Sequence, residues 1–177
     1  ISFLRPLIFK WNDPVKGEQK KNWVITPKVT ADLDQNVKIF TPLKKQKVVI
    51  NLRSHSKNQS GSIELKTPKG WNVTGSNSFQ FKLADEEQKI IFEITPASNA
   101  ETGFAEVYIN GRLAKGFHPI AYDHISSQLW FPDAKMKLVS LDLNIPPKKI
   151  GYLMGAGDKV GDALLNLGYE LDFLDPE

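Results

Sequence analysis

Short runs in which apolar and polar residues alternate are the feature of this sequence that most restricts its fold. In the clearest run, Val48, Ile50 and Leu52 occupy every second position. Because successive side chains of a strand point to opposite faces, such a run places its apolar residues on one face of a sheet. Four more runs follow the same pattern: residues 62–66, 79–83, 90–94 and 105–109.

Turn-forming residues separate these runs, without helical patterns between them. Asn110-Gly111 stands between Ile109 and Arg112 and predicts a two-residue β-hairpin. Seven or more short strands at this spacing are typical of an antiparallel β-sandwich. We therefore predict a mainly β chain with an immunoglobulin-like β-sandwich over residues 1–122. The pattern leaves the order of the strands open.

A linker with one further strand is predicted for residues 123–147. Its first part, residues 123–133, is polar and aromatic, and residues 136–143 then have the alternation of a strand. The double proline at positions 146 and 147 is a typical boundary marker. We therefore place a second structural unit after it.

Residues 148–177 have the pattern of a strand, a helix and a second strand. Residues 149–154 predict a buried strand, and the apolar residues of 160–167 repeat at the spacing of one helix face. Gly168 predicts the left-handed residue that ends a helix, and residues 169–174 predict the second strand. This is a short β-α-β, or α/β, segment.

A β-α-β unit of this size is too small to form a core of its own. Such units normally belong to a larger parallel sheet whose faces are covered by helices. We therefore expect residues 148–177 to be the truncated start of an α/β domain. We also expect the chain, which begins at Ile1, to be a piece of a larger protein. The segment should pack on the sandwich or mediate self-association.

Composition narrows the possible chemistry. The chain has no Cys, which excludes disulfides, thiolate metal ligands and a Cys nucleophile. Its charge balance is +7 over residues 1–122 and −4 over residues 123–177, and such a shift favours two distinct units. The basic residues are mainly Lys without interleaved aromatics, so we expect no nucleic-acid partner. Apolar runs long enough to span a bilayer are absent from the sequence.

The turn between the two strands of the α/β segment is one candidate ligand site. Gly155 and Gly157 stand between a predicted strand and a predicted helix, where backbone N–H groups can bind a phosphate. A dinucleotide-binding motif needs a third glycine at position 160, which is Val160. The alternative is a structural turn in which Asp158 caps the helix, and its carboxylate would then occupy the place of a phosphate.

The sequence predicts no metal site and no catalytic residue. His55, His118 and His124 have no second ligand at the spacing of a helical metal site, whereas zinc requires three or four converging ligands. A site in which Asp123 joins the latter two histidines is the remaining alternative. The sequence also contains no Gly-x-Ser-x-Gly motif. We expect no cofactor.

The tryptophans are candidates for stacking on a sugar. The chain has four, Trp11, Trp23, Trp71 and Trp130, and an exposed pair would indicate carbohydrate binding. Trp71 and Trp130 are candidate ligand-binding residues, together with the glycine turn of Gly155, Gly157 and Asp158. Since Trp is on average highly buried, we expect Trp71 to pack against the rim or core of the sandwich.

Five stretches together resemble a known arrangement of domains. Residues 11–18 and the Pro-x-Gly-Trp-x-Val turn at 68–73 resemble the accessory sandwich called the NPCBM-associated domain. Residues 120–125, 129–134 and 150–158 are similar to the joint that follows this sandwich in large bacterial de-N-acetylases of the PIG-L (LmbE-like) type. In that family a zinc deacetylase domain precedes the sandwich, and a domain similar to class I glutamine amidotransferases follows it.

The resemblance implies a part of a carbohydrate-active protein. The His-Pro-Asp-Asp type motif of the deacetylase has no counterpart in this sequence, so no catalytic residue is carried over. We expect a non-catalytic accessory or interaction domain that contacts the other domains of its parent protein, in the periplasm or outside the cell. The alternatives are a glycan-binding module that contacts polysaccharide, and a part of a nucleotide-binding or amidotransferase-like α/β enzyme.

Overall fold

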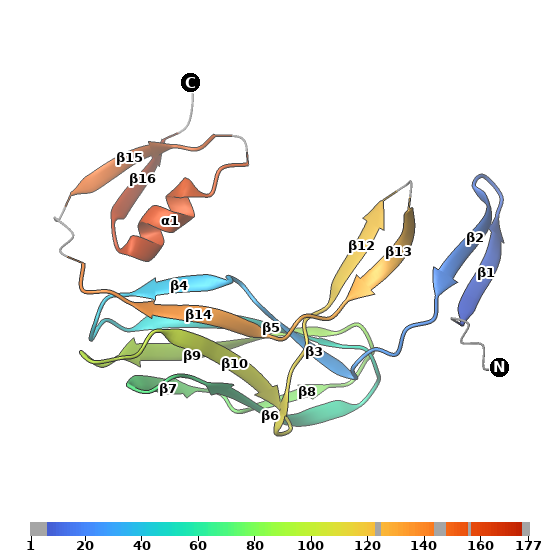
Figure 1. Cartoon of the computed structure of the whole chain (residues 1–177), viewed down its shortest axis with the longest axis horizontal. Helices are drawn as coiled ribbons and strands as arrows, with labels where there is room; N and C mark the ends of the chain where they lie inside the picture. Colours follow the sequence, from blue (N-terminus) through green and yellow to red (C-terminus); the bar gives the residue numbers. More distant parts are fainter. Residues whose placement is uncertain (1–6, 123–124, 144–147, 156, 175–177) are drawn as a thin grey trace, which may run out of the picture.

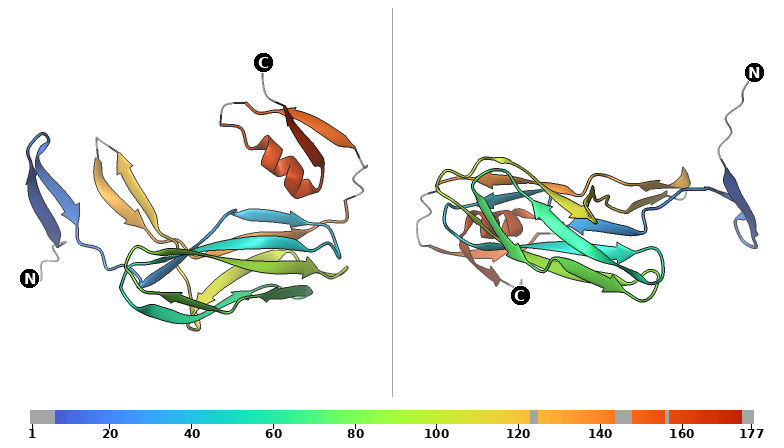
Figure 2. Two further views of the ribbon diagram at one scale, coloured as in Figure 1. Left: turned by 180° about the vertical axis from the view of Figure 1, so that it is seen from behind. Right: turned by 90° about the horizontal axis from the view of Figure 1, so that it is seen from below.

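The computed structural model describes residues 7–122, 125–143, 148–155 and 157–174. The chain is mainly β, as predicted, and its centre is a sandwich of two sheets (Figure 1). Two hairpins extend from one end of this sandwich, and a β-α-β unit lies at the other end (Figure 2). The chain is therefore elongated, with the sandwich between its two ends.

One sheet of the sandwich has four antiparallel strands in the order β3-β5-β9-β7. The long central strands pair from Gln46 opposite Ile94 to Arg53 opposite Glu87. The strands of this sheet are β3 (Val29–Leu33), β5 (Gln46–Ser54), β7 (Trp71–Gly75) and β9 (Glu87–Pro96).

The other sheet has the order β4-β14-β10-β6-β8, and the short β11 pairs with β10. Its pairs are antiparallel except for β4 and β14, which run parallel. The strands of this sheet are β4 (Val37–Phe40), β6 (Gln59–Lys66), β8 (Ser78–Phe81), β10 (Gly103–Ile109), β11 (Arg112–Leu113) and β14 (Lys135–Ser140).

The strand that we assigned to the linker belongs to the sandwich. β14 lies between β4 and β10, and its Met136 and Leu138 are fully buried. Burying two large apolar side chains stabilises this pairing by roughly 3–6 kcal/mol, which explains why the strand joins the sheet. The strands of the two sheets thus extend from residue 29 to residue 140, beyond the expected boundary at residue 122.

The apolar residues of the alternating runs form the core, as predicted. Val48, Ile50 and Leu52 of β5 have no exposed surface. The buried residues of the other four runs also belong to this core: Ile63, Leu65, Phe79, Phe81, Ile90, Phe92, Ile94, Ala105 and Val107. Leu83, which we expected at the end of one run, lies beyond β8 and is exposed. Alternation was therefore a reliable guide to the buried face, although not to the end of that strand.

The predicted two-residue hairpin at Asn110-Gly111 is confirmed. Both residues have positive φ, 50° and 75°, and they join β10 to β11. Positive φ at both positions is typical of the turn that matches the twist of paired strands. The Asn110 side chain also accepts a hydrogen bond from the Ser62 backbone N–H (2.9 Å), so the turn is tied to β6.

Two hairpins lie outside the two sheets of the sandwich, although we had placed both segments within or beside it. One consists of β1 (Ile8–Asp13) and β2 (Gly17–Asn22). The other consists of β12 (His118–Tyr122) and β13 (Ile125–Trp130). β2 and β13 lie side by side. An isolated two-stranded hairpin is marginally stable in water, so this contact helps to hold both in place.

The β-α-β prediction is confirmed in its connectivity. β15 (Lys149–Leu153) and β16 (Glu170–Leu174) are parallel, and α1 (Val160–Leu167) connects them. Gly168 has φ 98° and ends the helix as predicted. Its N–H donates to the Leu165 carbonyl (3.0 Å), and the next N–H donates to Leu164 (3.1 Å), which are the two hydrogen bonds of a Schellman motif.

The strand predicted at residues 149–154 is present as β15, but the prediction that it is buried is wrong. Leu153 and Met154 are more than half exposed, because one helix covers one face of the two strands and leaves the other face open. α1 lies beside β4, one of the two arrangements that we expected for this segment. Within the described residues, no helix is long and apolar enough to cross a membrane.

Candidate functional site

The β1-β2 hairpin presents two stacked aromatic rings. Phe9 and Trp11 are two positions apart on β1, so both point to one face of the hairpin. Their ring centroids are 5.6 Å apart with an interplanar angle of 28°. Both remain accessible, with exposed fractions of 55% and 40%. We call these two residues the aromatic platform.

Polar side chains border the aromatic platform. Gln19 lies opposite Trp11 and Lys21 lies opposite Phe9 in the hairpin register, and directly paired residues share one face. The Gln19 side-chain N–H donates to the Lys16 carbonyl (3.1 Å), which leaves its side-chain oxygen available as an acceptor. The face therefore combines flat apolar rings with an amide oxygen and an ammonium group.

The second hairpin carries another exposed aromatic. Trp130 is 57% exposed and contacts the His118 ring, with 5.5 Å between the ring centroids. His118 Nε2 also lies 2.9 Å from Asp32 Oδ1, and this contact positions the ring. Asp32 Oδ2 accepts a hydrogen bond from the Phe117 N–H (3.1 Å). One carboxylate of β3 thus attaches this hairpin to the sandwich.

A glycine allows this attachment. A Cβ atom at Gly116 would lie 2.4 Å from Asp32 Oδ1 and 3.1 Å from His118 Nε2. A Cβ atom at 2.4 Å would displace the Asp32 carboxylate from this position, so glycine allows its contacts with Phe117 and His118. The residue after it, Phe117, contacts His55 on one side and Phe131 on the other.

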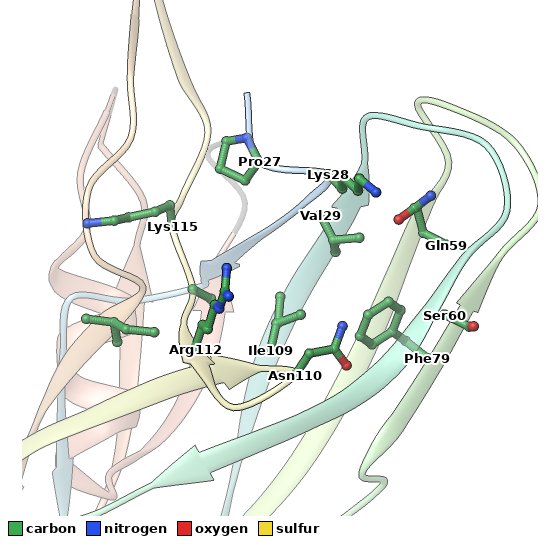
Figure 3. A pocket seen from close by; sticks show the side chains of 12 residues that line it. Pro27, Lys28, Val29, Gln59, Ser60, Phe79, Ile109, Asn110, Arg112 and Lys115 are labelled. Atoms are coloured by element: carbon green, nitrogen blue, oxygen red, sulfur yellow. The ribbon is translucent and has the colours of Figure 1, made fainter. Parts of the chain in front are cut away.

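A groove of about 520 Å³ lies at the same end of the sandwich as the two hairpins (Figure 3). Its size falls within the range of about 300–1,000 Å³ that is usual for ligand pockets. The apolar residues that line it include Val29, Phe79, Ile109 and Leu113. The polar residues around it are Lys28, Gln59, Ser60, Asn110, Arg112 and Lys115.

The groove is basic. None of its lining residues is acidic. Lys115 is neutralised by Asp133, with 2.5 Å between the ammonium nitrogen and the carboxylate, and this pair holds the pKa of Asp133 below its ordinary value. Lys28 and Arg112 make no ion pair with any residue that the structure describes. Two uncompensated cations therefore border one cavity.

His55 is a titratable group that contacts Phe117, the residue before β12. One ring nitrogen, Nε2, is 3.0 Å from the Thr30 hydroxyl, and the ring lies against Phe117. Burial lowers the pKa of His55, the neighbouring Arg53 guanidinium lowers it further, and Asp85 acts in the opposite direction. The native state therefore favours the neutral imidazole.

We expect the free energy of unfolding to fall when the pH drops below about 6.5, the ordinary pKa of histidine. The unfolded chain binds a proton at His55 before the folded chain does, so the loss continues down to the lowered folded-state pKa. Urea unfolding at a series of pH values measures this loss in the free energy of unfolding. His55→Gln should flatten the curve in this interval, whereas His118→Gln should leave the contribution of His55 in place. An unchanged slope in His55→Gln would contradict the prediction.

Of the predicted site residues, Trp71 is a core residue. Its exposed fraction is 8%, and its ring packs edge-on against Phe40, with centroids 5.0 Å apart. The indole N–H donates to the Glu101 carbonyl (2.7 Å). A ligand would have to displace the core to reach this ring, so Trp71 is not available for stacking. Trp130, the other candidate, is accessible.

In the glycine turn, the Asp158 carboxylate occupies the start of the helix. Asp158 accepts hydrogen bonds from the Val160 backbone N–H (2.7 Å) and from the Tyr152 hydroxyl. Together they lower the pKa of this carboxyl, the Tyr152 contribution being the larger. Gly157 has φ 74°, and the Gly155 carbonyl accepts a long hydrogen bond from the Asp158 N–H (3.4 Å). A carboxylate stands at the helix start, which favours the structural turn over a phosphate site.

The possible site of Asp123 with His118 and His124 lies partly outside the described residues. Asp123 and His124 belong to the part that the structure does not describe, and His118 instead pairs with Asp32. Within the described ranges, no group of three or more His, Asp or Glu side chains is placed to hold a metal ion.

Sequence reasoning included Trp11 among the candidate stacking residues, but it missed the partner ring of Phe9 and the groove. Phe9 and Trp11 are two positions apart, which is a local signal that one strand face carries both rings. Lys28 and Arg112 are far apart in the sequence, and nothing in the local pattern links them.

Comparison with protein families found no family model that matches this sequence. Comparison with curated proteins also found no match.

Proposed function

We propose that this chain is a non-catalytic accessory module that binds a glycan for a larger carbohydrate-active protein. The observation that carries the proposal is the aromatic platform of Phe9 and Trp11, two stacked and accessible rings. Aromatic side chains supply large, rigid contact area, and the apolar face of a sugar ring is flat enough to lie on it.

The surroundings of the platform support a sugar over a purely apolar ligand. Gln19 and Lys21 share its face and offer an acceptor and a donor at the edge of the rings. Ligand sites generally combine apolar surface with a few polar groups that set orientation. Trp130 on the neighbouring hairpin is a further exposed aromatic at the same end of the chain.

The shape of the chain supports an accessory role. The hairpins and the β-α-β unit lie at opposite ends of the sandwich (Figure 2). A module of this shape would present a glycan at one end while its other end contacts further domains of the parent protein. The resemblance to the sandwich region of PIG-L-type de-N-acetylases fits this role, and we propose a periplasmic or extracellular location on the same basis.

Substitution of Trp11 by alanine tests the proposal. Isothermal titration calorimetry against a panel of neutral and acidic oligosaccharides would first identify the tightest ligand of the wild-type chain. Trp11→Ala is expected to weaken that binding at least about tenfold, equivalent to about 1.4 kcal/mol, because half of the stacking surface is removed. Phe9→Ala should have a smaller effect in the same direction.

Val15→Ala is the matched control. Val15 lies in the turn of the same hairpin and is 92% exposed, so its truncation removes apolar surface without touching the platform. Its affinity should equal that of the wild type, and thermal unfolding should show that all variants remain folded. A panel without any binding oligosaccharide, or a Trp11→Ala variant with unchanged affinity, would contradict the proposed function.

A further inference from the structure

The basic groove shown in Figure 3 has the chemistry of a site for an acidic sugar. Its cations come from separate segments: Lys28 directly precedes β3, and Arg112 begins β11. Neither makes an ion pair with a residue that the structure describes, and none of the lining residues is acidic. An anionic group in the groove would thus meet two uncompensated positive charges.

The neutral polar groups of the groove include both donors and acceptors. The Asn110 side-chain oxygen is used by the Ser62 N–H (2.9 Å), which leaves its amide N–H groups free to donate. The Gln59 amide donates to the Lys57 carbonyl (2.8 Å), which leaves its side-chain oxygen free to accept. A sugar ring carries hydroxyls that both donate and accept, so it matches this mixture better than an inorganic anion, which offers acceptors alone.

Part of the groove lining is apolar. Val29, Phe79 and Ile109 contribute to it, among the polar side chains that Figure 3 shows. This combination suits a pyranose ring, which has apolar C–H faces and a polar circumference. A carboxylate on such a ring can also form a bidentate pair with a guanidinium, the strongest type of ionic hydrogen bond.

We infer that this groove binds a carboxylate-bearing sugar unit, with Arg112 and Lys28 pairing with the carboxylate. The inference rests on the proposed glycan-binding function and specifies its ligand class as an acidic glycan. The residues that line the groove belong to segments at the end of the sandwich from which the β1-β2 hairpin extends (Figure 1), and the segment between β2 and β3 connects the two sites. An oligosaccharide long enough to follow this segment would contact both surfaces.

Tetragalacturonate and its fully methyl-esterified form provide matched probes, since esterification removes the charges and keeps the sugar chain. Calorimetry on the full chain at low salt should show that the acid binds at least about tenfold more tightly than the ester. Arg112→Gln and Lys28→Gln should each reduce this preference severalfold, and the double variant should abolish it.

Lys89→Gln is the matched control, because it removes one exposed charge from β9, outside the groove. It should retain the full preference for the acid. Trp11→Ala separates the two proposals: it should weaken acid and ester equally and leave their ratio unchanged. If Trp11→Ala weakens binding while Arg112→Gln leaves the ratio unchanged, the glycan-binding function stands and the acidic groove does not.

Three other results would overturn the inference. The first is equal binding of acid and ester by the wild-type chain, and the second is no binding of the acid. The third involves a hexaglutamate peptide as a probe of acidic polypeptide. If this peptide binds more tightly than tetragalacturonate and depends on the same two cations, the occupant is an acidic peptide and not a sugar.

Discussion

Replacing Trp71 by alanine is expected to lower the free energy of unfolding by about 3–5 kcal/mol, the usual cost of truncating a large buried aromatic. The side chain is 8% exposed and packs edge-on against Phe40, so its removal leaves a cavity between the sheets. It also removes the hydrogen bond to the Glu101 carbonyl. Urea unfolding followed by circular dichroism measures the change.

Two further variants separate this structural role from ligand binding. Trp71→Phe keeps an aromatic ring in the core and loses the indole hydrogen bond, so it should cost about 1–2 kcal/mol and leave glycan affinity unchanged. Ile91→Ala is an exposed truncation on the neighbouring strand β9 and should cost well under 1 kcal/mol. A Trp71→Phe variant that folds normally but loses glycan affinity would show that Trp71 contacts the ligand.

Gly70→Ala is expected to destabilise the sandwich by about 3 kcal/mol, from the sum of backbone strain and a steric clash. Gly70 has φ 83°, a conformation that side chains with a Cβ atom disfavour. A Cβ atom would also lie 2.8 Å from the backbone Cα of Ala100, which cannot rotate away as a flexible side chain would. The Gly70 carbonyl accepts the Ala97 N–H (2.8 Å), so any backbone shift would disturb that hydrogen bond as well.

Gly111→Ala separates the backbone strain from the steric clash. Gly111 has nearly the same φ, 75°, but no atom within 4 Å of the position of an added Cβ. This variant should therefore cost only the strain, about 1–2 kcal/mol. Equal losses of stability in the two variants, measured by urea unfolding, would show that the contact with Ala100 has no energetic effect.

Local patterns predicted the strands and turns that depend on neighbouring residues. The alternation of Val48, Ile50 and Leu52 predicted one buried face, because the strand period is two whatever the partner strand. Asn110-Gly111 and Gly168 predicted left-handed backbone, because these residue types tolerate positive φ at low cost. Each of these features is decided within a few residues.

The role of each tryptophan could not be predicted in this way. Trp11 and Trp71 both lie in short strands, and yet one is on a projecting hairpin and the other is in the core. The difference arises because β7 pairs with β9 inside a sheet, whereas β1 pairs only with β2 within the described residues. Whether a strand face is covered depends on a second sheet that is distant in sequence.

The sites also depend on distant pairs. Asp32 accepts the N–H of Phe117 and pairs with His118, although more than eighty residues separate them. The groove likewise combines Lys28, Gln59 and Arg112 from three separate segments. Isolated polar residues in loops have no local signature that distinguishes a shared cavity from a solvated surface.

By itself, the sequence determined the mainly β class, the inward face of most strands, the hairpin at Asn110-Gly111 and the β-α-β connectivity at residues 149–174. Tertiary structure alone decided that β14 lies between β4 and β10, which aromatic rings remain exposed, and which cations share a groove. The physical reason is range. Side-chain alternation and backbone φ preferences act between neighbours along the chain, whereas burial, strand order and convergence of charges are set by segments that meet only after the chain has folded.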